Sequence, residues 1–175
     1  MNKKINKIYI QMFYVLVFAY LAVASADFMF SYDGPPTKDL SSKELLNATS
    51  TGGPYTYSQS AHRFSGTGYD GTAIDTTSCC SGQSGSCRNN PSCQCQVSVG
   101  PLPQGVYTLG NMMTFKGMPY CYELYPSASN SMCGRSGFLI HGGSCSGNPS
   151  EGCIVIENES TRYKIKSGAS LKVIS

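Results

Sequence analysis

The sequence has little net charge and no long helical pattern, and each absence excludes a class of protein. Its 13 basic residues outnumber its 10 acidic residues by three, but three of the lysines lie among the first seven residues. Without that segment the chain is formally neutral, so it lacks the basic surface of a protein that binds nucleic acid or adsorbs to anionic surfaces. No stretch repeats apolar residues at the helical period over several turns, which argues against a mainly helical domain.

The first 26 residues have the features of a secretory signal peptide. The early lysines form a basic start, a mostly apolar run covers residues 8–22, and Ala24–Ala26 matches an A-x-A cleavage site. The apolar run is short for a membrane span, which disfavours an uncleaved anchor. We therefore expect a secreted, monomeric protein of residues 27–175, with no stable membrane association after cleavage.

Short apolar runs separated by Gly and Pro turns predict a mainly β domain. The mature chain is long enough for a single domain with its own core. One short helix is expected at residues 41–46, where Ser41 caps and Glu44 completes a capping box. The expected strands lie at residues 28–34 (with a turn), 55–57, 106–109, 138–140, 154–156 and 171–174.

The chain has nine cysteines, an odd number. In an exported protein, cysteines form disulfides, and one left over is a candidate reactive thiol. The other eight are expected to form four bridges of unassigned pairing. Five of the nine fall in residues 79–95, a segment almost without apolar side chains, which we interpret as a disulfide-held insertion at about 78–96. Zinc ligation is the disfavoured alternative, because the segment has no histidine and no paired C-x₂-C spacing.

A histidine and a cysteine flank the loop between two of the expected strands. Residues 138–140 end on His141, and Ser150-Glu151-Gly152 leads into Cys153 at the start of the next apolar run. A neighbouring imidazole makes a thiol nucleophilic by taking its proton and lowering its pKa. The alternative is a structural cysteine beside an interior histidine. The odd count, the strand edges and the preceding glycine together favour catalysis.

These residues resemble the active-site signature of L,D-transpeptidase-like (YkuD-type) cysteine enzymes, in which His-Gly precedes Ser-x-Gly-Cys-Ile. The similarity is closest to their Tlde1-like branch of secreted antibacterial effectors. It extends to residues 65–68, 100–107, 134–138, 162 and 171–173. The resemblance implies an L,D-transpeptidase-like β-sandwich or barrel with short helices, no cofactor and no metal.

The implied reaction is acyl transfer from peptidoglycan stem peptides through a thioester on Cys153. His141 is the implied base and then acid, oriented by the backbone carbonyl of Gly142 or Gly143. The amides near Gly152 and Cys153 are the implied oxyanion donors. Water as acceptor gives an L,D-carboxypeptidase, and an amine gives a transpeptidase.

Two further residues are candidates on the substrate side. Ser150 is expected to brace the turn before the cysteine. Arg135 is expected either to hold a substrate carboxylate or to be an ordinary surface arginine. Met112, Met113 and Met118 are interpreted as core or flap residues, with a substrate groove as the alternative.

The sequence departs from the wider family at two positions. Typical cell-wall transpeptidases carry His-Gly before the cysteine and Arg after the following isoleucine, whereas Glu151 and Val155 stand at those two positions here. This difference favours the effector-like branch over cross-linking enzymes. Cys145 is also unusual, and is expected either to staple the loop to the insertion or to pair with Cys153.

Two alternative functions remain at this point. One is a non-catalytic, disulfide-rich module that binds muropeptides or a protein, and the other is a peptidoglycan endopeptidase. Sequons at Asn47 and Asn158 predict a glycoprotein if the host glycosylates.

Overall fold

The structure is a computed structural model that describes residues 52–147 and 149–175. The expected signal peptide, the strand and turn at 28–34, the helix at 41–46 and the sequon at Asn47 lie outside these residues. The described part consists of strands, one five-residue helix and one short 3-10 helix. It runs in the order β1 (Tyr55–Ser58), β2 (Arg63–Thr67), β3 (Ala73–Thr76), β4 (Cys79–Ser81), η1 (Pro91–Cys93), β5 (Gly105–Phe115), β6 (Met118–Pro126), β7 (Leu139–His141), β8 (Ile154–Ile156), α3 (Glu159–Tyr163) and β9 (Ser170–Ile174).

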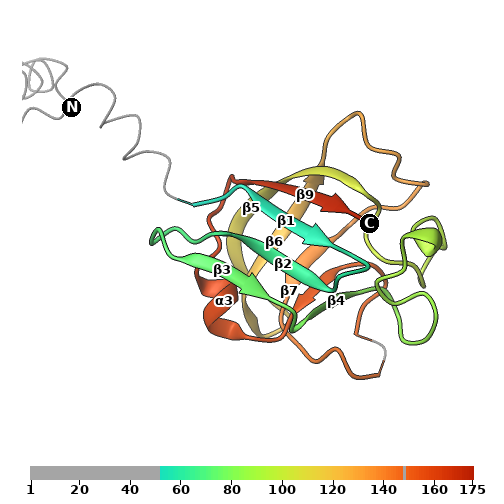
Figure 1. Cartoon of the computed structure of the whole chain (residues 1–175), viewed down its shortest axis with the longest axis horizontal. Coiled ribbons are helices and arrows are strands. Elements are labelled where there is room, and N and C mark those ends of the chain that lie inside the picture. Colours follow the sequence, from blue (N-terminus) through green and yellow to red (C-terminus); the bar gives the residue numbers. More distant parts are fainter. Residues whose placement is uncertain (1–51, 148) are drawn as a thin grey trace, which may run out of the picture. The chain divides into compact units, whose positions relative to one another are not determined.

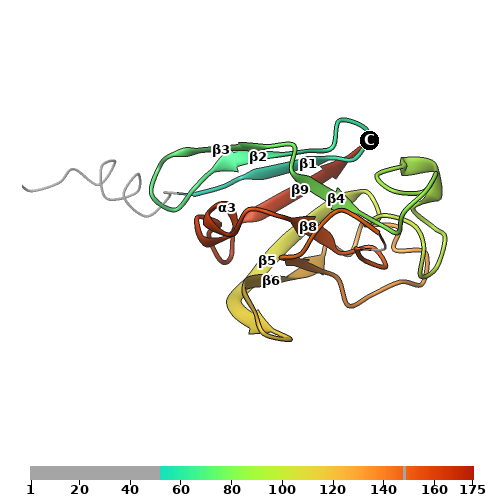
Figure 2. The same cartoon turned by 90° about the horizontal axis from the view of Figure 1, so that it is seen from below.

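All nine strands belong to one sheet, in the order β3-β2-β1-β9-β5-β6-β7-β8-β4. The sheet curls strongly, so that β1, β2 and β3 form one layer while β5 and β6 cross beneath them (Figures 1 and 2). Strand β9 joins the layers, because it pairs in parallel with β1 and antiparallel with β5. The predicted mainly β, barrel-like fold is confirmed.

Strands β5 and β6 form the long hairpin of the domain. Phe115 pairs with Met118 across the turn residues Lys116 and Gly117, both of which have positive φ. Two positive φ angles in a two-residue turn match the twist of the flanking strands. The hairpin is shifted in register between Leu109 and Met112, and such irregularities bend a strand.

The core lies inside the curled sheet and is rich in tyrosine. Tyr55, Tyr57, Tyr107 and Tyr122 are fully buried beside the aliphatic residues of β7, β8 and β9. Their hydroxyl groups are paired; that of Tyr122, for example, donates to the carbonyl oxygens of two residues around the end of α3. Because buried hydroxyls are costly when unpaired, these bonds let tyrosine serve as core material.

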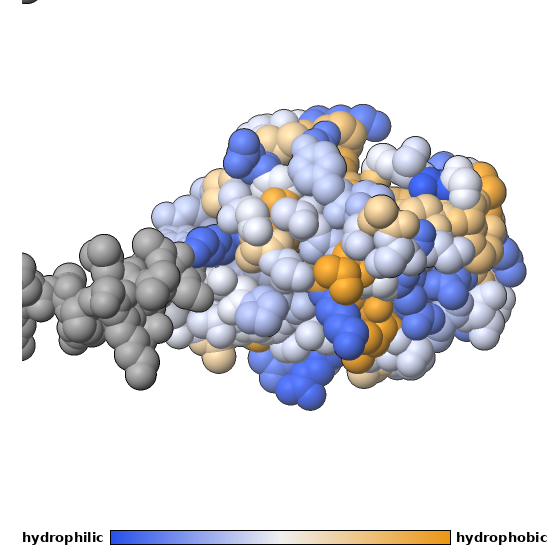
Figure 3. Space-filling view, turned by 90° about the horizontal axis from the view of Figure 1, so that it is seen from above, coloured by the Kyte–Doolittle hydropathy of each residue, from blue (hydrophilic) through white to orange (hydrophobic). Residues whose placement is uncertain are grey.

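One face of the domain mixes apolar patches with strongly hydrophilic ones (Figure 3). Within residues 52–147 and 149–175, no helix has the length and hydrophobicity that a membrane crossing requires.

The predicted strands at 55–57, 106–109, 138–140, 154–156 and 171–174 all correspond to strands of the sheet, with shifts of one residue or extensions at their ends. Strands β2, β3 and β6 were not predicted. The segment expected to be an insertion begins with β4, which pairs with β8 and so belongs to the sheet.

Candidate active site

Strands β7 and β8 place His141 and Cys153 on adjacent segments of the chain, two positions apart in the strand register. The two strands pair in parallel, with Ile140 opposite Ile154 and His141 opposite Val155. Both isoleucines are 0% exposed, so the core fixes this register. Cys153 directly precedes β8 and lies level with Leu139, whose amide donates a hydrogen bond to the Cys153 sulfur over 3.3 Å.

The imidazole of His141 is oriented by the next residue of the chain. Its Nδ1 lies 2.6 Å from the carbonyl oxygen of Gly142. A carbonyl oxygen only accepts hydrogen bonds, so Nδ1 carries the proton and Nε2 is left as the basic nitrogen. This is the tautomer that a general base needs.

The buried side chain of Arg162 packs against the backbone of Gly142. Its guanidinium is 3% exposed and donates through Nη1 to the carbonyl oxygens of Ile156 (2.7 Å) and Glu157 (3.1 Å). A Cβ atom at Gly142 would lie 2.7 Å from Nη2 of Arg162, closer than such atoms approach. The family resemblance in the sequence includes Arg162 but predicted no role for it. Its hydrogen-bond partners are backbone carbonyls, which no side-chain pattern reveals, and Nη2 also lies 3.9 Å from the Glu159 carboxylate.

The Cys153 thiol is partly buried and reduced. Burial raises its pKa, while the hydrogen bond from Leu139 and the positive charge of Arg135 act in the opposite direction. This direction is opposite to the lowered pKa expected from an imidazole–thiolate pair. The resting cysteine is therefore a neutral thiol at pH 7, and attack requires transfer of its proton to a base.

The turn before Cys153 is held by two serine hydroxyls. Ser150 donates to the carbonyl oxygen of Cys153 (2.8 Å) and accepts from the amides of Gly82 (3.2 Å) and Gly152 (3.4 Å). Ser81, fully buried, donates to the carbonyl oxygen of Gly152 (2.9 Å). The hydroxyl of Ser150 thus lies inside the turn that it was expected to brace, and Ser81 was missed because it stands in the cysteine-rich segment.

Arg135 is buried, although both expectations for it assumed an accessible side chain. It is 7% exposed, and its guanidinium lies over the Phe138 ring at 5.0 Å from the centroid. Its two terminal nitrogens donate to four carbonyl oxygens, those of Gln94, Gly100, Pro101 and Glu151. The surface alternative is wrong, and the nitrogens that would grip a substrate carboxylate are already engaged.

Three disulfides connect the cysteines: Cys80–Cys145, Cys87–Cys93 and Cys95–Cys133. The expectation of four bridges is therefore wrong. Cys79 and Cys121 stay free and buried, in β4 and β6, and Cys153 is the third free cysteine. In the described residues, no group of three or more His, Cys, Asp or Glu is placed to hold a metal ion.

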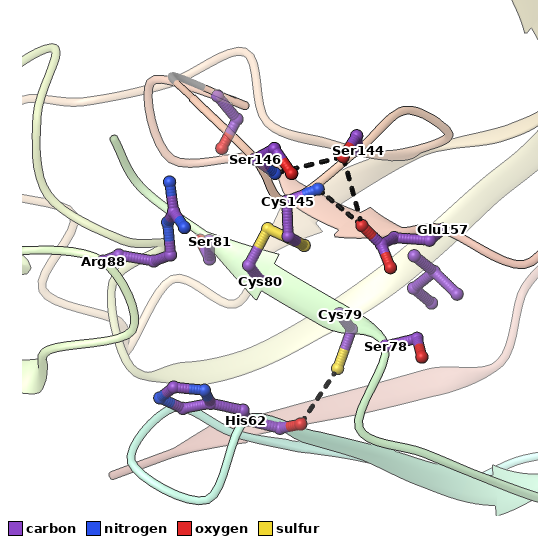
Figure 4. The surroundings of a disulfide bond; sticks show 12 residues. His62, Ser78, Cys79, Cys80, Ser81, Arg88, Ser144, Cys145, Ser146 and Glu157 are labelled. Atoms are coloured by element: carbon purple, nitrogen blue, oxygen red, sulfur yellow. Dashed lines mark hydrogen bonds between the residues drawn. A yellow bond between two sulfur atoms is a disulfide. The ribbon is translucent and has the colours of Figure 1, made fainter. Parts of the chain in front are cut away.

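The Cys80–Cys145 bond staples the loop between His141 and Cys153 to β4 (Figure 4). Glu157 fastens the same loop, because its carboxylate accepts from the Cys145 amide (2.7 Å) and the Ser144 hydroxyl (3.4 Å). Of the two expectations for Cys145, stapling is the one the structure shows. Cys153 is left without a disulfide partner.

A groove of about 570 Å³ lies along the β5–β6 hairpin and the start of β7. Leu139, whose amide contacts the Cys153 sulfur, is among the residues that line it, whereas Cys153 and His141 are not. Met113 and Phe115 line it, whereas Met112 is 40% exposed. None of Met112, Met113 and Met118 is buried, so the core part of their interpretation is wrong, while the flap part stays a prediction. The lining residues are Met113, Phe115, Glu123, Leu124, Tyr125, Pro126, Gly137, Phe138 and Leu139.

Comparison with known proteins identifies a matching family model and similar solved structures. The model of the family described as "Tlde1 domain" matches residues 75–173, more than half of the chain. A solved structure titled "Structure of LD transpeptidase LdtMt1 in complex with imipenem" is similar over 69% of this chain, with 16% identity and a TM-score of 0.41. The similarity spans 57% of the length of that chain. A search of curated proteins finds no match.

Proposed function

Because the chain belongs to the Tlde1 domain family, we propose that it is a cysteine enzyme of peptidoglycan stem peptides. The observation that carries the proposal is the state of Cys153. Six of the nine cysteines are in disulfides and two more are buried, whereas Cys153 is free and partly exposed beside the strand that ends at His141. A folded protein has little structural need for such a thiol.

The reaction begins with proton transfer from the neutral thiol. The Nε2 of His141 takes the proton of Cys153 as the sulfur attacks the carbonyl carbon on the L-centre side of an L,D-peptide bond. The hydrogen bond from Nδ1 to Gly142 holds the imidazole in the required tautomer and stabilises its cationic form. A tetrahedral oxyanion forms next to the turn that precedes Cys153.

Collapse of this intermediate breaks the carbon–nitrogen bond. His141 returns the proton to the departing D-amino acid, and the acyl group stays on the sulfur as a thioester. Water or an amine then attacks the thioester, His141 takes the proton of the attacking group, and Cys153 leaves as the thiol. Hydrolysis gives a shortened stem, and an amine acceptor gives an exchanged one.

In this proposal the backbone amides of the turn at Gly152 stabilise the oxyanion. In the resting structure the Gly152 amide faces the Ser150 hydroxyl over 3.4 Å, a long and therefore weak contact. We place the developing charge against the amides of Gly152 and Cys153, where backbone donors stabilise it. Because its contact with Ser150 is weak, the Gly152 amide can exchange that contact for a hydrogen bond to the oxyanion at little cost in free energy.

The groove is where we place the peptide. Its apolar wall, from Met113 and Phe115 to Phe138, would cover the stem, and Leu139, which also lines the groove, donates its amide to the Cys153 sulfur. Glu123 is the charged residue among those lining it. A carboxylate in an otherwise apolar groove favours a stem whose third residue carries a free amine, as diaminopimelate does.

Secretion and an antibacterial role complete the proposal. Three disulfides suit an oxidising environment outside the cytosol. Peptidoglycan is accessible there, and trimming or exchanging its stems weakens the wall of a bacterium. Asn158, exposed at the start of α3, is a proposed glycosylation site in a host that glycosylates.

The test is mass spectrometry of diaminopimelate-type tetrapeptide muropeptides incubated with the oxidised protein. Half of the reactions contain a free D-amino acid. Loss or exchange of the terminal D-alanine, abolished by Cys153→Ala, supports the proposal. Cys79→Ala is the matched control, because Cys79 is also a free cysteine but lies buried in β4.

Other outcomes identify the alternatives. Binding of the tetrapeptide without any mass change, equally strong in Cys153→Ala, indicates a muropeptide-binding module and overturns the enzyme proposal. Cleavage of cross-linked dimers with intact tetrapeptides indicates an endopeptidase.

A further inference from the structure

We propose that Arg135 is a positioning residue that fixes the turn before Cys153 and supplies a positive charge near the reacting sulfur. The inference rests on the proposed function for its kinetic consequence. In this proposal the guanidinium of Arg135 binds carbonyl groups of the enzyme's own backbone and not a carboxylate of the substrate.

The first observation is how completely the guanidinium is occupied. Nη1 donates to the carbonyl oxygens of Gln94 (2.5 Å) and Pro101 (2.6 Å), and Nη2 donates to those of Gly100 (2.9 Å) and Glu151 (2.8 Å). These carbonyls belong to three separate segments, the cysteine-rich segment, the turn before β5 and the turn before Cys153. A planar fork with several donors can join three segments in one fixed geometry, which an ammonium group cannot do.

The second observation is the contact with Gly152. A Cβ atom there would lie 2.3 Å from Nη2 of Arg135 and 2.6 Å from Cε1 of Phe138. The backbone of Gly152, with φ of +122°, therefore rests directly on the stacked guanidinium and ring. Arg135 donates a hydrogen bond to the carbonyl of Glu151 and packs against the Cα of Gly152. These two contacts fix the backbone path that leads into Cys153.

The third observation is electrostatic. No ion pair joins Arg135 to a carboxylate within residues 52–147 and 149–175. Its charge is balanced only by carbonyl dipoles, and burial lowers its own pKa. An unneutralised cation of this kind favours negative charge on nearby atoms, and it lowers the pKa of the Cys153 thiol against the effect of burial. The same field favours the oxyanion that forms on the attacked carbonyl.

These observations predict a change in kcat with little change in KM. Arg135→Lys keeps the positive charge but cannot donate to all four carbonyl oxygens. Arg135→Met removes both the charge and the hydrogen bonds. We expect kcat for tetrapeptide turnover to fall about 10-fold in Arg135→Lys and about 100-fold in Arg135→Met, because displacing a reacting group by one ångström costs that much. KM is expected to stay within about twofold, since the guanidinium touches no substrate.

A second readout separates Arg135 from the proposed function. The rate of Cys153 alkylation by iodoacetamide is followed against pH by mass spectrometry of the labelled peptide. We expect the midpoint to shift to higher pH in Arg135→Met and less in Arg135→Lys, because the nearby cation is lost only in the former. This readout needs no peptidoglycan activity. If the wild type leaves tetrapeptides unchanged, it still tests the role of Arg135.

The contrary results are equally specific. A rise in KM with kcat retained, which disappears when the terminal carboxylate of the tetrapeptide is amidated, would show that Arg135 binds that carboxylate. An unchanged alkylation profile in a folded Arg135→Met protein, checked by circular dichroism, would reduce Arg135 to a structural brace. If Arg135→Met does not fold, the kinetic constants and the alkylation profile of Arg135→Lys test the proposal instead.

Discussion

Arg162 and Gly142 lie so close that the glycine has no room for a side chain, and this contact supports the imidazole of His141. A Cβ atom at Gly142 would lie 2.7–2.8 Å from the Nη2 and Cζ atoms of Arg162. The carbonyl of Gly142 in turn accepts the hydrogen bond from His141. The position of the proposed base therefore depends on a buried arginine 21 residues further along the chain.

Gly142→Ala is expected to reduce activity because the new methyl group pushes the loop away from Arg162. The carbonyl at position 142 then moves and the imidazole loses its orientation. We expect kcat/KM to fall at least about 10-fold, with a loss of about 1–3 kcal/mol in the free energy of unfolding from overpacking. Ser146→Ala, an exposed change in the same loop, is the control for tetrapeptide assays and chemical denaturation. Normal activity in Gly142→Ala would show that the Gly142 contact does not orient His141.

Removing the Cys80–Cys145 bond should destabilise the protein more than removing Cys87–Cys93. The first bond spans 65 residues and the second spans 6. Loop-closure entropy gives losses of roughly 4 and roughly 2 kcal/mol for the two alanine pairs. Urea unfolding of both double variants measures the difference. Equal losses would indicate that native contacts, not chain entropy, determine the effect.

The stability of the protein should decline in alkaline solution partly because of Cys79. Burial raises the pKa of this thiol from 9.0 to about 12. A raised pKa in the folded state means that the stabilisation is complete below pH 9 and is lost as the pH rises towards 12. The free energy of unfolding should therefore fall less steeply between pH 9 and 11 in Cys79→Ala than in the wild type. Parallel slopes would show that Cys79 does not titrate with unfolding.

Glu123 is expected to select stems that carry a free amine. Glu123→Gln removes the charge of the groove but keeps its shape, so KM for a diaminopimelate-type tetrapeptide should rise about 10-fold. The same tetrapeptide with its side-chain amine acetylated is the control, and its KM should be equal for both proteins. Tyr125→Phe, which removes the hydroxyl that donates to the Glu123 carboxylate, tests whether that bond holds the carboxylate in place. An equal rise for both substrates would contradict amine recognition.

The sequence predicted the strands that stand out as short apolar or aromatic runs between turn residues. Residues 154–156 are a continuous apolar run, and all three are 0% exposed in β8. Strand β6 was missed because it alternates buried and exposed positions and contains Pro119 and Pro126, which suggest turns. A half-buried strand with prolines near its ends has no strong local signal.

The site was predictable where chemistry depends on a side chain and unpredictable where it depends on the backbone. His141 and Cys153 stand in a recognisable motif, and the strand register brings them to neighbouring strands. The partners of Arg135 are carbonyl oxygens from segments far apart in the sequence, and Arg162 donates to the carbonyl oxygens of Ile156 and Glu157, a few residues before it. Every residue has a carbonyl group, so no pattern of residue types marks those that an arginine will bind.

The disulfide between Cys95 and Cys133 closes beside the junction that Arg135 holds. Cys95 follows Gln94, whose carbonyl accepts from Arg135, and Cys133 lies two residues before Arg135. With the proposed chemistry, the protein must keep six sulfurs oxidised and a seventh, on Cys153, reduced. Strong reductants would then open the disulfides that hold the segments around the site, whereas strong oxidants would consume the Cys153 thiol, so the proposed activity is confined to a limited range of redox conditions.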